Sequence, residues 1–535
     1  MTNFSICSPA AIQTPAVYGA EILSLSAAWV TNYTDYIPYS FNYNGGNVDL
    51  ENAKFCNITV KYTHPGYEDN ITVETWLPEP ANWNGRLQAT GGGGWAAGRF
   101  VLSEFFMGGA LGEGFATTTT DAGLGKDTTG PREWALTSPG NVDWVAVENF
   151  GSRAYNDQAI IGKSLVNSFY GRAPEYSYWS GCSQGGRQGM MIAERYPTAY
   201  DGIAASAPAQ SFTKFTSSLY YPLFMRFWHN VNPLVCELDF LTSEAIAHCD
   251  PLDGAVDGLI SNMTACNYDP YTAVNKTFTC DSLNRTIPLS QGAALIADAA
   301  WSGAHTTDGR QLWYGYNPGS DIGSTFGVEP GYNSSSTSTM KDEWFNLFVA
   351  KNISFNTAGL SHEEYQEFFN LVTSEYGSSW NADDANLHAF KNAGGKLLTY
   401  HGMVRLSPFL FSASLPYHTV QPELTQCLPQ ADPSIPTKGT EYLYNKARAL
   451  FPDIHDFWRF FESPGLGHCA GGLGGQPTTV LKALQRWVEN GTAPDTLSVE
   501  YPSLGNGLHR NLCPYPSQME YVGGNVALAE SFRCT

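Results

Sequence analysis

The stretch EYSYWSGCSQGGRQGMMIAERYP, Glu175–Pro197, decides the fold class of this chain. Residues 175–180 alternate and are rich in aromatic side chains, which predicts a β-strand, and residues 185–196 read as a helix that ends before the proline. Between them, G-C-S-Q-G matches the G-x-S-x-G turn that presents a nucleophilic serine between a strand and a helix. We therefore expect an α/β protein with an α/β-hydrolase fold and Ser183 as its nucleophile.

Two groups are expected to stabilise negative charge on a substrate oxygen beside Ser183. The start of the following helix places the Gln184 N–H and positive dipole potential near the nucleophile. A second donor is expected from GRLQATGGGGWAAG, where residues 87–90 read as a strand and a glycine run follows, with Gly92 and Gly93 as candidate donors. A flexible surface turn is the alternative interpretation of that run.

The predicted base is His468, in FWRFFESPGLGHCAGG, where a strand is followed by a loop rich in glycine and proline. A single histidine is more often structural than catalytic. This one is followed directly by Cys469, just as Ser183 is preceded directly by Cys182. A disulfide between these two cysteines would hold the serine and the imidazole within hydrogen-bonding reach.

The paired CS and HC motifs resemble those of the fungal tannase and feruloyl esterase family. The resemblance extends from Cys7 to Cys534 through CNITVKYTHPG, TGGGGW, GCSQGGRQG, CDPLDGAVDGLI, GGKLLTYHG and WVENGTAP. It implies hydrolysis of phenolic acid esters by an α/β-hydrolase domain with a large inserted, aromatic-lined lid domain and one structural calcium ion. We place the catalytic domain at residues 1–210 and 390–535 and the lid at residues 211–389.

The catalytic acid stands apart from its usual place in the sequence. In the family that the chain resembles, the strand ending in YHG is followed closely by an aspartate and an IP turn. Here HGM is followed by residues 404–430 and only then by ADPSIP, so that removing this segment would give HGMADPSIP. The acid is therefore expected to be Asp432, and the order Ser183, Asp432, His468 is that of α/β-hydrolases.

We interpret residues 404–430 as a retained intron that has been translated. The segment has 27 residues, or 81 nucleotides, which preserves the reading frame. Its first residues, Val-Arg, can be encoded by GTACGT, and its last, Gln, by CAG, which match intron ends. Removing Cys427 also turns an odd number of cysteines, eleven, into an even number. The alternative is a genuine surface loop, because loops tolerate insertions well.

The stretch CDPLDGAVDGLISN offers hard oxygen ligands of the kind that calcium prefers. Acidic residues in a glycine-rich loop can also simply be solvated, and this alternative stays open on spacing alone. The resemblance implies a calcium site that ties the lid down, with these ligands: the carboxylates of Asp250, Asp253 and Asp257 and the carbonyls of Ala255 and Leu259.

The cysteines and ten N-x-S/T sequons indicate an oxidising compartment, and we expect a secreted glycoprotein. The first residues, MTNFSICSPA, lack the basic and apolar regions of a signal peptide, so we expect that this segment is missing from the chain. A protein that is not secreted is the alternative. The resemblance implies the disulfides Cys7–Cys56, Cys182–Cys469, Cys249–Cys266 and Cys513–Cys534, and Cys236–Cys280 follows by elimination.

The charge balance and hydropathy exclude two classes of partner. With 29 basic and 50 acidic residues the net charge is −21, which argues against binding a nucleic acid. No apolar run approaches the roughly 18 residues that a membrane span requires. We therefore expect neither a nucleic acid nor a membrane as a partner, and the oligomeric state stays open.

The function expected from the resemblance is that of a feruloyl esterase that releases ferulic acid from plant cell-wall polysaccharide such as xylan. A tannase, which hydrolyses gallate esters, is the alternative. Gln184 stands where tannases of the family carry an acid, and the chain has no adjacent Lys/Arg pair for processing, so both features favour the feruloyl esterase. A non-catalytic binding protein of the same fold is the second alternative, should the segment 404–430 displace Asp432.

Overall fold

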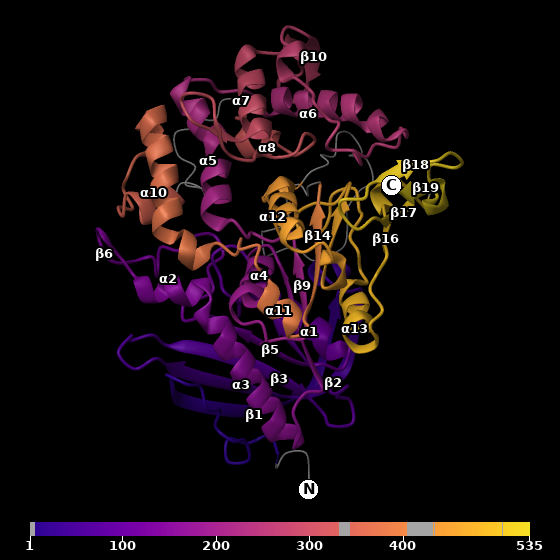
Figure 1. Ribbon diagram of the computed structural model, residues 1–535. Coiled ribbons are helices and arrows are strands. Elements are labelled where there is room, and N and C mark those ends of the chain that lie inside the picture. Colours follow the sequence, from indigo (N-terminus) through magenta and orange to yellow (C-terminus); the bar gives the residue numbers. More distant parts are fainter. Residues whose placement is uncertain (1–5, 331–342, 404–431, 433, 506) are drawn as a thin grey trace.

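A nine-stranded sheet forms the centre of the computed structural model, which describes residues 6–330, 343–403, 432, 434–505 and 507–535 (Figure 1). The strand order is β1-β2-β3-β5-β4-β8-β9-β14-β15. Neighbours from β1 to β5 pair antiparallel, and those from β5 to β15 pair parallel. The strands have these bounds: β1 Glu21–Ile37, β2 Val48–Thr63, β3 Ile71–Pro78, β4 Arg86–Thr90, β5 Ala116–Thr120, β8 Tyr176–Cys182, β9 Gly202–Ser206, β14 Lys396–Gly402 and β15 Trp458–Ser463.

The parallel strands are buried because helices cover both of their faces. All residues of β5 and β9 are buried, as expected for parallel strands between two helical layers. Trp179 of β8 packs in the core on the side of α4 (Gln184–Arg195), and its neighbour Tyr178 packs in the core that includes α13 (Val480–Asn490). Helices α1 (Val101–Gly112) and α3 (Arg153–Tyr170) also contact the sheet. This packing fixes the position at which the loop after β8 leaves the sheet.

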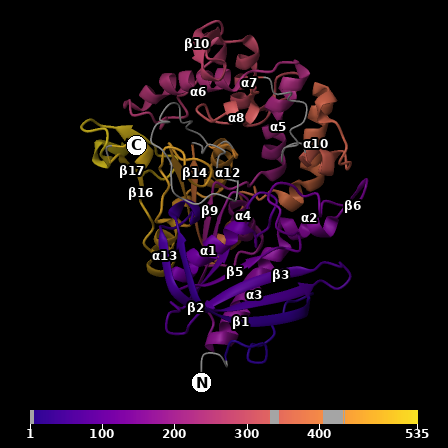
Figure 2. The same ribbon diagram turned by 180° about the vertical axis from the view of Figure 1, so that it is seen from behind.

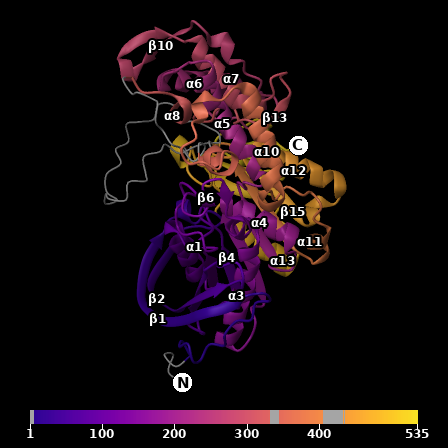
Figure 3. The same cartoon turned by 90° about the vertical axis from the view of Figure 1, so that its left-hand side faces the viewer.

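After β9 the chain leaves the sheet and forms a group of helices above it, which Figure 2 shows from behind. In the side view of Figure 3 these helices lie at one end of the molecule and β1 and β2 at the other. The group falls within residues 211–389, and the division of the chain into two domains at those residues stays a prediction. Its larger helices are α5 Phe212–Trp228, α6 Val235–Cys249, α7 Gln291–Ser302 and α10 His362–Trp380.

Five disulfides cross-link the described chain, and they are the five expected pairs. The longest closure joins Cys182 to Cys469, which are 287 residues apart in the sequence. This number of disulfides indicates an oxidising compartment. No helix among the described residues has the length and apolar character needed to cross a bilayer.

The C-terminal segment contacts a loop from the group of helices that follows β9. It contains β16 (Leu497–Glu500) and β17 (His509–Leu512), whose Arg510 forms a buried ion pair with Asp257 of residues 249–262, here called the acidic loop. The guanidinium of Arg510 also lies 3.9 Å from the centre of the Phe532 ring. A buried pair of this kind constrains where the acidic loop can lie, because separating it would leave an uncompensated buried charge.

Candidate active site

Ser183 stands on the sharp turn between β8 and α4, at the carboxyl end of the sheet. Its backbone angles, φ of 63° and ψ of −121°, lie in a region that residues other than glycine seldom adopt. Two glycines make this turn possible: a Cβ atom at Gly181 would lie 2.5 Å from the backbone of Gly185. The Ser183 N–H donates to the carbonyl of Ser206, 3.0 Å away, which holds the turn against the end of β9.

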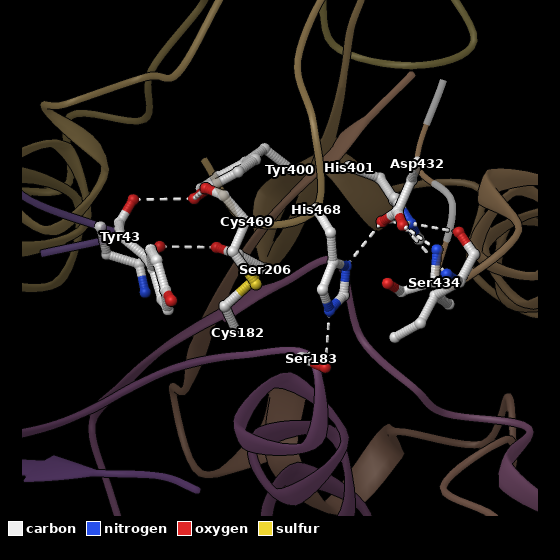
Figure 4. The surroundings of a disulfide bond; sticks show 12 residues. Tyr43, Cys182, Ser183, Ser206, Tyr400, His401, Asp432, Ser434, His468 and Cys469 are labelled. Carbon is white, nitrogen blue, oxygen red and sulfur yellow. Dashed lines mark hydrogen bonds and ion pairs between the residues drawn. A yellow bond between two sulfur atoms is a disulfide. The ribbon is translucent and has the colours of Figure 1, made fainter. Parts of the chain in front are cut away.

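The structure brings the three predicted residues together in one hydrogen-bonded chain (Figure 4). His468 Nε2 lies 2.8 Å from Ser183 Oγ, and His468 Nδ1 lies 2.8 Å from Asp432 Oδ2. A carboxylate at Nδ1 keeps the ring proton there and leaves Nε2 free to accept the serine proton. The arrangement therefore prepares Ser183 Oγ to act as a nucleophile.

Asp432 is held in place by its own neighbours. Its side chain is 1% exposed, and Oδ1 accepts the N–H groups of Ser434 at 2.7 Å and Ile435 at 3.0 Å. Burial raises the pKa of the Asp432 carboxyl, but the imidazoles of His468 and His401 outweigh it and hold the pKa well below its usual range. The carboxylate is thus ionised when it orients His468.

His401, the last but one residue of β14, is a member of this network that the sequence reasoning missed. It is fully buried, and its Nε2 lies 3.2 Å from Asp432 Oδ2 and 3.1 Å from the carbonyl oxygen of Ile435. Its Nδ1 lies 2.9 Å from Thr440 Oγ1, whose hydroxyl can donate to it. Two acceptors at Nε2 and a donor at Nδ1 assign the proton to Nε2. The signal was present in YHG, but only as part of a family motif.

The Cys182–Cys469 disulfide ties the nucleophile turn to the loop of the base. The two Cα atoms lie 5.9 Å apart, with Ser183 next to one cysteine and His468 next to the other. The hydroxyl of Tyr400 lies between two carbonyl oxygens, 2.9 Å from that of Cys469 and 2.7 Å from that of Tyr43, and shares its one proton between them. These contacts fix the backbone on which His468 stands.

The structure corrects the expected donors of the glycine run. The Gly92 N–H donates to Gln188 Oε1 at 2.9 Å, and the Gly93 N–H donates to the carbonyl of Ala96 at 3.1 Å. Both glycines line the cavity above Ser183, but their N–H groups already donate hydrogen bonds within the protein. Gln184 and Gly94 also line it, and no hydrogen bond within the described chain uses their N–H groups. These two are the better candidate donors.

A cavity of about 1220 Å³ opens above Ser183 and His468. Trp95, Phe212 and Phe215 are among its aromatic lining residues, and the last two belong to α5 of the lid group. Such a cavity is large enough for a drug-sized ligand, and aromatic side chains favour a flat, apolar group. The site therefore combines a nucleophile with room for an aromatic substrate.

The acidic loop holds its carboxylates in separate hydrogen bonds. Asp250 Oδ1 accepts the N–H of Asp257 at 3.2 Å, and Asp257 is paired with Arg510. Asp253 Oδ2 is buried and accepts no hydrogen bond, and burial raises the pKa of this carboxyl to about 6. Within the described ranges, no group of three or more His, Cys, Asp or Glu side chains is placed to hold a metal. Of the three carboxylates, Asp253 is thus the one with a buried oxygen that no described group contacts by a hydrogen bond.

Residues 404–430, interpreted as a translated intron, lie outside the described residues. Asp432 itself is described, and its partners among the described residues are His401, Ser434, Ile435 and His468. These contacts place the acid beside the base.

The fold and this geometry define a serine hydrolase. The family model described as "Tannase and feruloyl esterase" matches residues 56–535. A probable feruloyl esterase of Arthroderma benhamiae is 34% identical over 532 residues, covering 98% of this chain and 93% of the relative. A tannase of Aspergillus oryzae is 26% identical over 558 residues, covering 92% of this chain and 87% of the relative.

Solved structures show the same fold. A tannin acyl hydrolase from Aspergillus niger has a TM-score of 0.83 at 24% identity and covers 99% of this chain and 95% of its own. Feruloyl esterase B from Aspergillus oryzae has a TM-score of 0.75 at 25% identity, covering 97% of both chains. The chain belongs to the tannase and feruloyl esterase family, and it is a carboxylic ester hydrolase.

Replacing His401 tests its role in positioning Asp432. His401→Leu should lower kcat about 10- to 100-fold with little change in KM, because a hydrogen bond to a charged group is lost. The acid limb of the pH profile should move to higher pH, because the pKa of Asp432 rises without this donor. His401→Gln, which keeps an N–H donor, should recover part of the activity. A folded His401→Leu enzyme with unchanged kcat and pH profile would contradict this role.

Proposed function

We propose that this chain is a feruloyl esterase with Ser183, Asp432 and His468 as its catalytic residues. The observation that carries the proposal is the continuous hydrogen-bonded chain from Asp432 through His468 to Ser183, which ends in an aromatic-lined cavity. Several relatives of the chain are named feruloyl esterases, which supports a hydroxycinnamate ester as the substrate.

The reaction follows from the positions of the protons. His468 Nε2 takes the proton of Ser183 as Oγ attacks the ester carbonyl, and Asp432 stabilises the imidazolium that forms. The N–H groups of Gln184 and Gly94 are the proposed donors to the oxyanion. His468 then gives its proton to the departing alcohol. A water molecule, activated by the same imidazole, hydrolyses the acyl-enzyme and releases the acid.

A tannase remains the alternative activity, since relatives include a tannase. Gln184 stands where tannases of the family carry an acid, which favours the feruloyl esterase; here its side-chain oxygen accepts a hydrogen bond from Arg187 Nε at 2.8 Å. An acid at this position would instead form an ion pair with that fully buried guanidinium. The second alternative, a non-catalytic binding protein, is not supported, because the Ser–His–Asp chain is intact and the chain belongs to a family of esterases.

Hydrolysis of two methyl esters tests the substrate and the nucleophile together. Methyl ferulate should have a higher kcat/KM than methyl gallate, and Ser183→Ala should lower kcat by about 10⁶-fold because it removes the nucleophile. Ser374→Ala, on the exposed side of α10, is the matched control and should keep full activity. A preference for methyl gallate would point to a tannase, and near-normal turnover by Ser183→Ala would refute the assignment of the nucleophile.

We propose that the acidic loop binds one calcium ion, with Asp253 as the principal side-chain ligand. The buried oxygen of Asp253 that accepts no hydrogen bond supports this proposal, because burying a charge without a partner is costly. Asp250, Asp257 and the carbonyls of Ala255 and Leu259 remain the other proposed ligands. When bound, the ion would neutralise the carboxylates and hold the loop against the C-terminal segment.

Thermal unfolding with and without the ion tests this site. Calcium should raise the Tm of the chelator-treated protein more than magnesium does, because the loop offers flexible oxygen ligands. Asp253→Asn should remove most of this increase while leaving the Tm in chelator unchanged or higher, since a buried charge is removed. An equal response of the two proteins to calcium would exclude Asp253 as a ligand.

We propose that residues 404–430 are a translated intron and that the enzyme does not require them. Contacts near Asp432 support this, because they join β14 to the chain after the segment: the Thr437 hydroxyl donates to the carbonyl of Gly402 at 2.9 Å, and Thr440 contacts His401. Rejoining Met403 to Ala431 recreates the HGMADPSIP sequence of the family pattern.

Deleting residues 404–430 tests this proposal. The deletion variant should keep kcat and KM for methyl ferulate within about two-fold, because every described partner of Asp432 is retained. Sequencing of the spliced transcript should show the 81 nucleotides to be absent. A folded but inactive deletion variant, or a peptide from 404–430 in the mass spectrum of the natural protein, would contradict it.

We propose that the enzyme is secreted and acts on plant cell-wall polysaccharide. The five disulfides support an oxidising, extracellular setting, and the ten sequons are consistent with passage through the secretory route. The substrate would then be a ferulate ester of a neutral sugar, and its alcohol must find a place in the same cavity as the aromatic acid.

A further inference from the structure

Residues 92–97, which follow β4, form a small hairpin, here called the glycine hairpin. Gly93 and Ala96 each donate an N–H to the carbonyl of the other, both at 3.1 Å, so Gly94 and Trp95 form the turn at its tip. Gly94 has a φ of 57°, and two-residue turns of this kind need a positive φ at their first position. The N–H of Gly94, a proposed oxyanion donor, therefore moves whenever the hairpin moves.

One buried side chain spans the base of the glycine hairpin. Gln188 Oε1 accepts the N–H of Gly92 at 2.9 Å, and Gln188 Nε2 donates to the carbonyl of Ala97 at 2.9 Å. An amide side chain can make both bonds because it carries an acceptor and a donor side by side. The side chain of Gln188 is fully buried, so water cannot take over either bond if the amide is removed.

The same helix carries Gln188 and begins at the nucleophile. Gln188 is the fifth residue of α4, which starts directly after Ser183 and lies beneath it in Figure 4. The backbone of α4 adds a second tie, because the Gly185 N–H donates to the carbonyl of Gly92 at 3.1 Å. A Cβ atom at Gly91 would lie 2.6 Å from the Cα of Gly185, so the chain entering the hairpin lies directly against the helix. The position of the hairpin relative to Ser183 is therefore set by α4.

The tip of the hairpin is held by a different part of the molecule. The Trp95 ring is buried, with its centre 5.3 Å from that of Phe212 on α5 and 6.1 Å from that of Trp380 on α10. The tip thus packs among the helices above the sheet, whereas the base is bonded to the helix of the nucleophile. An oxyanion donor must be placed in advance relative to the nucleophile, and the contact that does so here is the one at the base.

We propose that Gln188 is a positioning residue for ester hydrolysis: by bridging Gly92 and Ala97 it holds the glycine hairpin, and with it the Gly94 N–H, where the oxyanion forms beside Ser183. Gln188 is not among the described residues that line the cavity, so it acts through the hairpin. This rests on the proposed function, because it assumes that an oxyanion forms there. The donor meets full negative charge only in the transition state, so the effect belongs to kcat more than to substrate binding.

Gln188→Met tests this role, because methionine fills a similar volume and makes neither hydrogen bond. For methyl ferulate, kcat should fall about 10- to 100-fold while KM stays within about three-fold, because a displaced donor stabilises the oxyanion less. Gln158→Met is the matched control. Gln158 on α3 is also fully buried and donates to a backbone carbonyl, that of Thr118 at 2.9 Å, but it does not line the cavity. The control should keep kcat within about two-fold even where its Tm falls.

Two inhibitors separate stabilisation of the oxyanion from binding of the aromatic group. trans-Styrylboronic acid forms a tetrahedral adduct with the serine that places an oxygen at the oxyanion position, whereas coniferyl alcohol offers the ring and side chain of ferulic acid without a carboxyl group. Gln188→Met should bind the boronic acid more weakly by about the factor by which kcat/KM falls, and it should bind coniferyl alcohol as the wild type does. An equal loss for both inhibitors, or no loss for either, would overturn the role of Gln188 and leave the proposed function intact.

Gln188→Glu decides the matter if Gln188→Met does not fold. It keeps the shape and the acceptor for the Gly92 N–H, and its carboxyl can donate to the carbonyl of Ala97 only when protonated. The ratio of its kcat to that of the wild type should be below one at about pH 8 and should rise as the pH falls, because burial raises the pKa of a carboxyl at this position. A ratio that does not change with pH would overturn the role. A wild type that does not hydrolyse methyl ferulate would overturn the proposed function itself.

Discussion

The buried carboxylate of Asp432 is the group on which the rest of the site depends. It is removed from water, and four donors keep it charged: the imidazoles of His468 and His401 and the N–H groups of Ser434 and Ile435. These donors come from β14, from the turn just before α12 (Thr437–Leu450) and from the loop after β15. The position of the acid thus depends on the parallel arrangement of β14 and β15, which brings these donors to the same end of the sheet.

The nucleophile illustrates how backbone strain and packing support one another. Ser183 occupies a strained backbone conformation. The glycines at 181 and 185 let the chain turn sharply there, and the carbonyl of Ser206, which accepts the Ser183 N–H, holds the turn in place. The helix behind it then directs its first N–H groups at the cavity. A well-packed sheet, with Trp179 buried against α4, supplies the rigidity that keeps this geometry.

The strand and helix around Ser183 and the strand before the glycine run could be predicted within one or two residues, because their apolar patterns and punctuating glycines are local signals. The presence of a strand before His468 could be predicted as well, but not its bounds. Asp432 could be predicted as the acid from the family pattern around YHG and IP. His401 could not be predicted as its partner, because a buried histidine in a strand looks like any other core residue. The glycine donors were misassigned at Gly92 and Gly93, because the direction of an N–H depends on long-range partners such as Gln188. The hydrogen bond from Gln476 to the carbonyl of Tyr39 joins segments 437 residues apart and leaves no local trace in the sequence.

The Cys182–Cys469 disulfide has a consequence for when the enzyme becomes active during its life. It is the covalent link between the two loops that carry Ser183 and His468, so the reduced chain must hold nucleophile and base together by weaker contacts alone. In a reducing cytosol this link would not persist. The covalent restraint on nucleophile and base therefore depends on the redox state of the protein's surroundings, which the fold itself does not set.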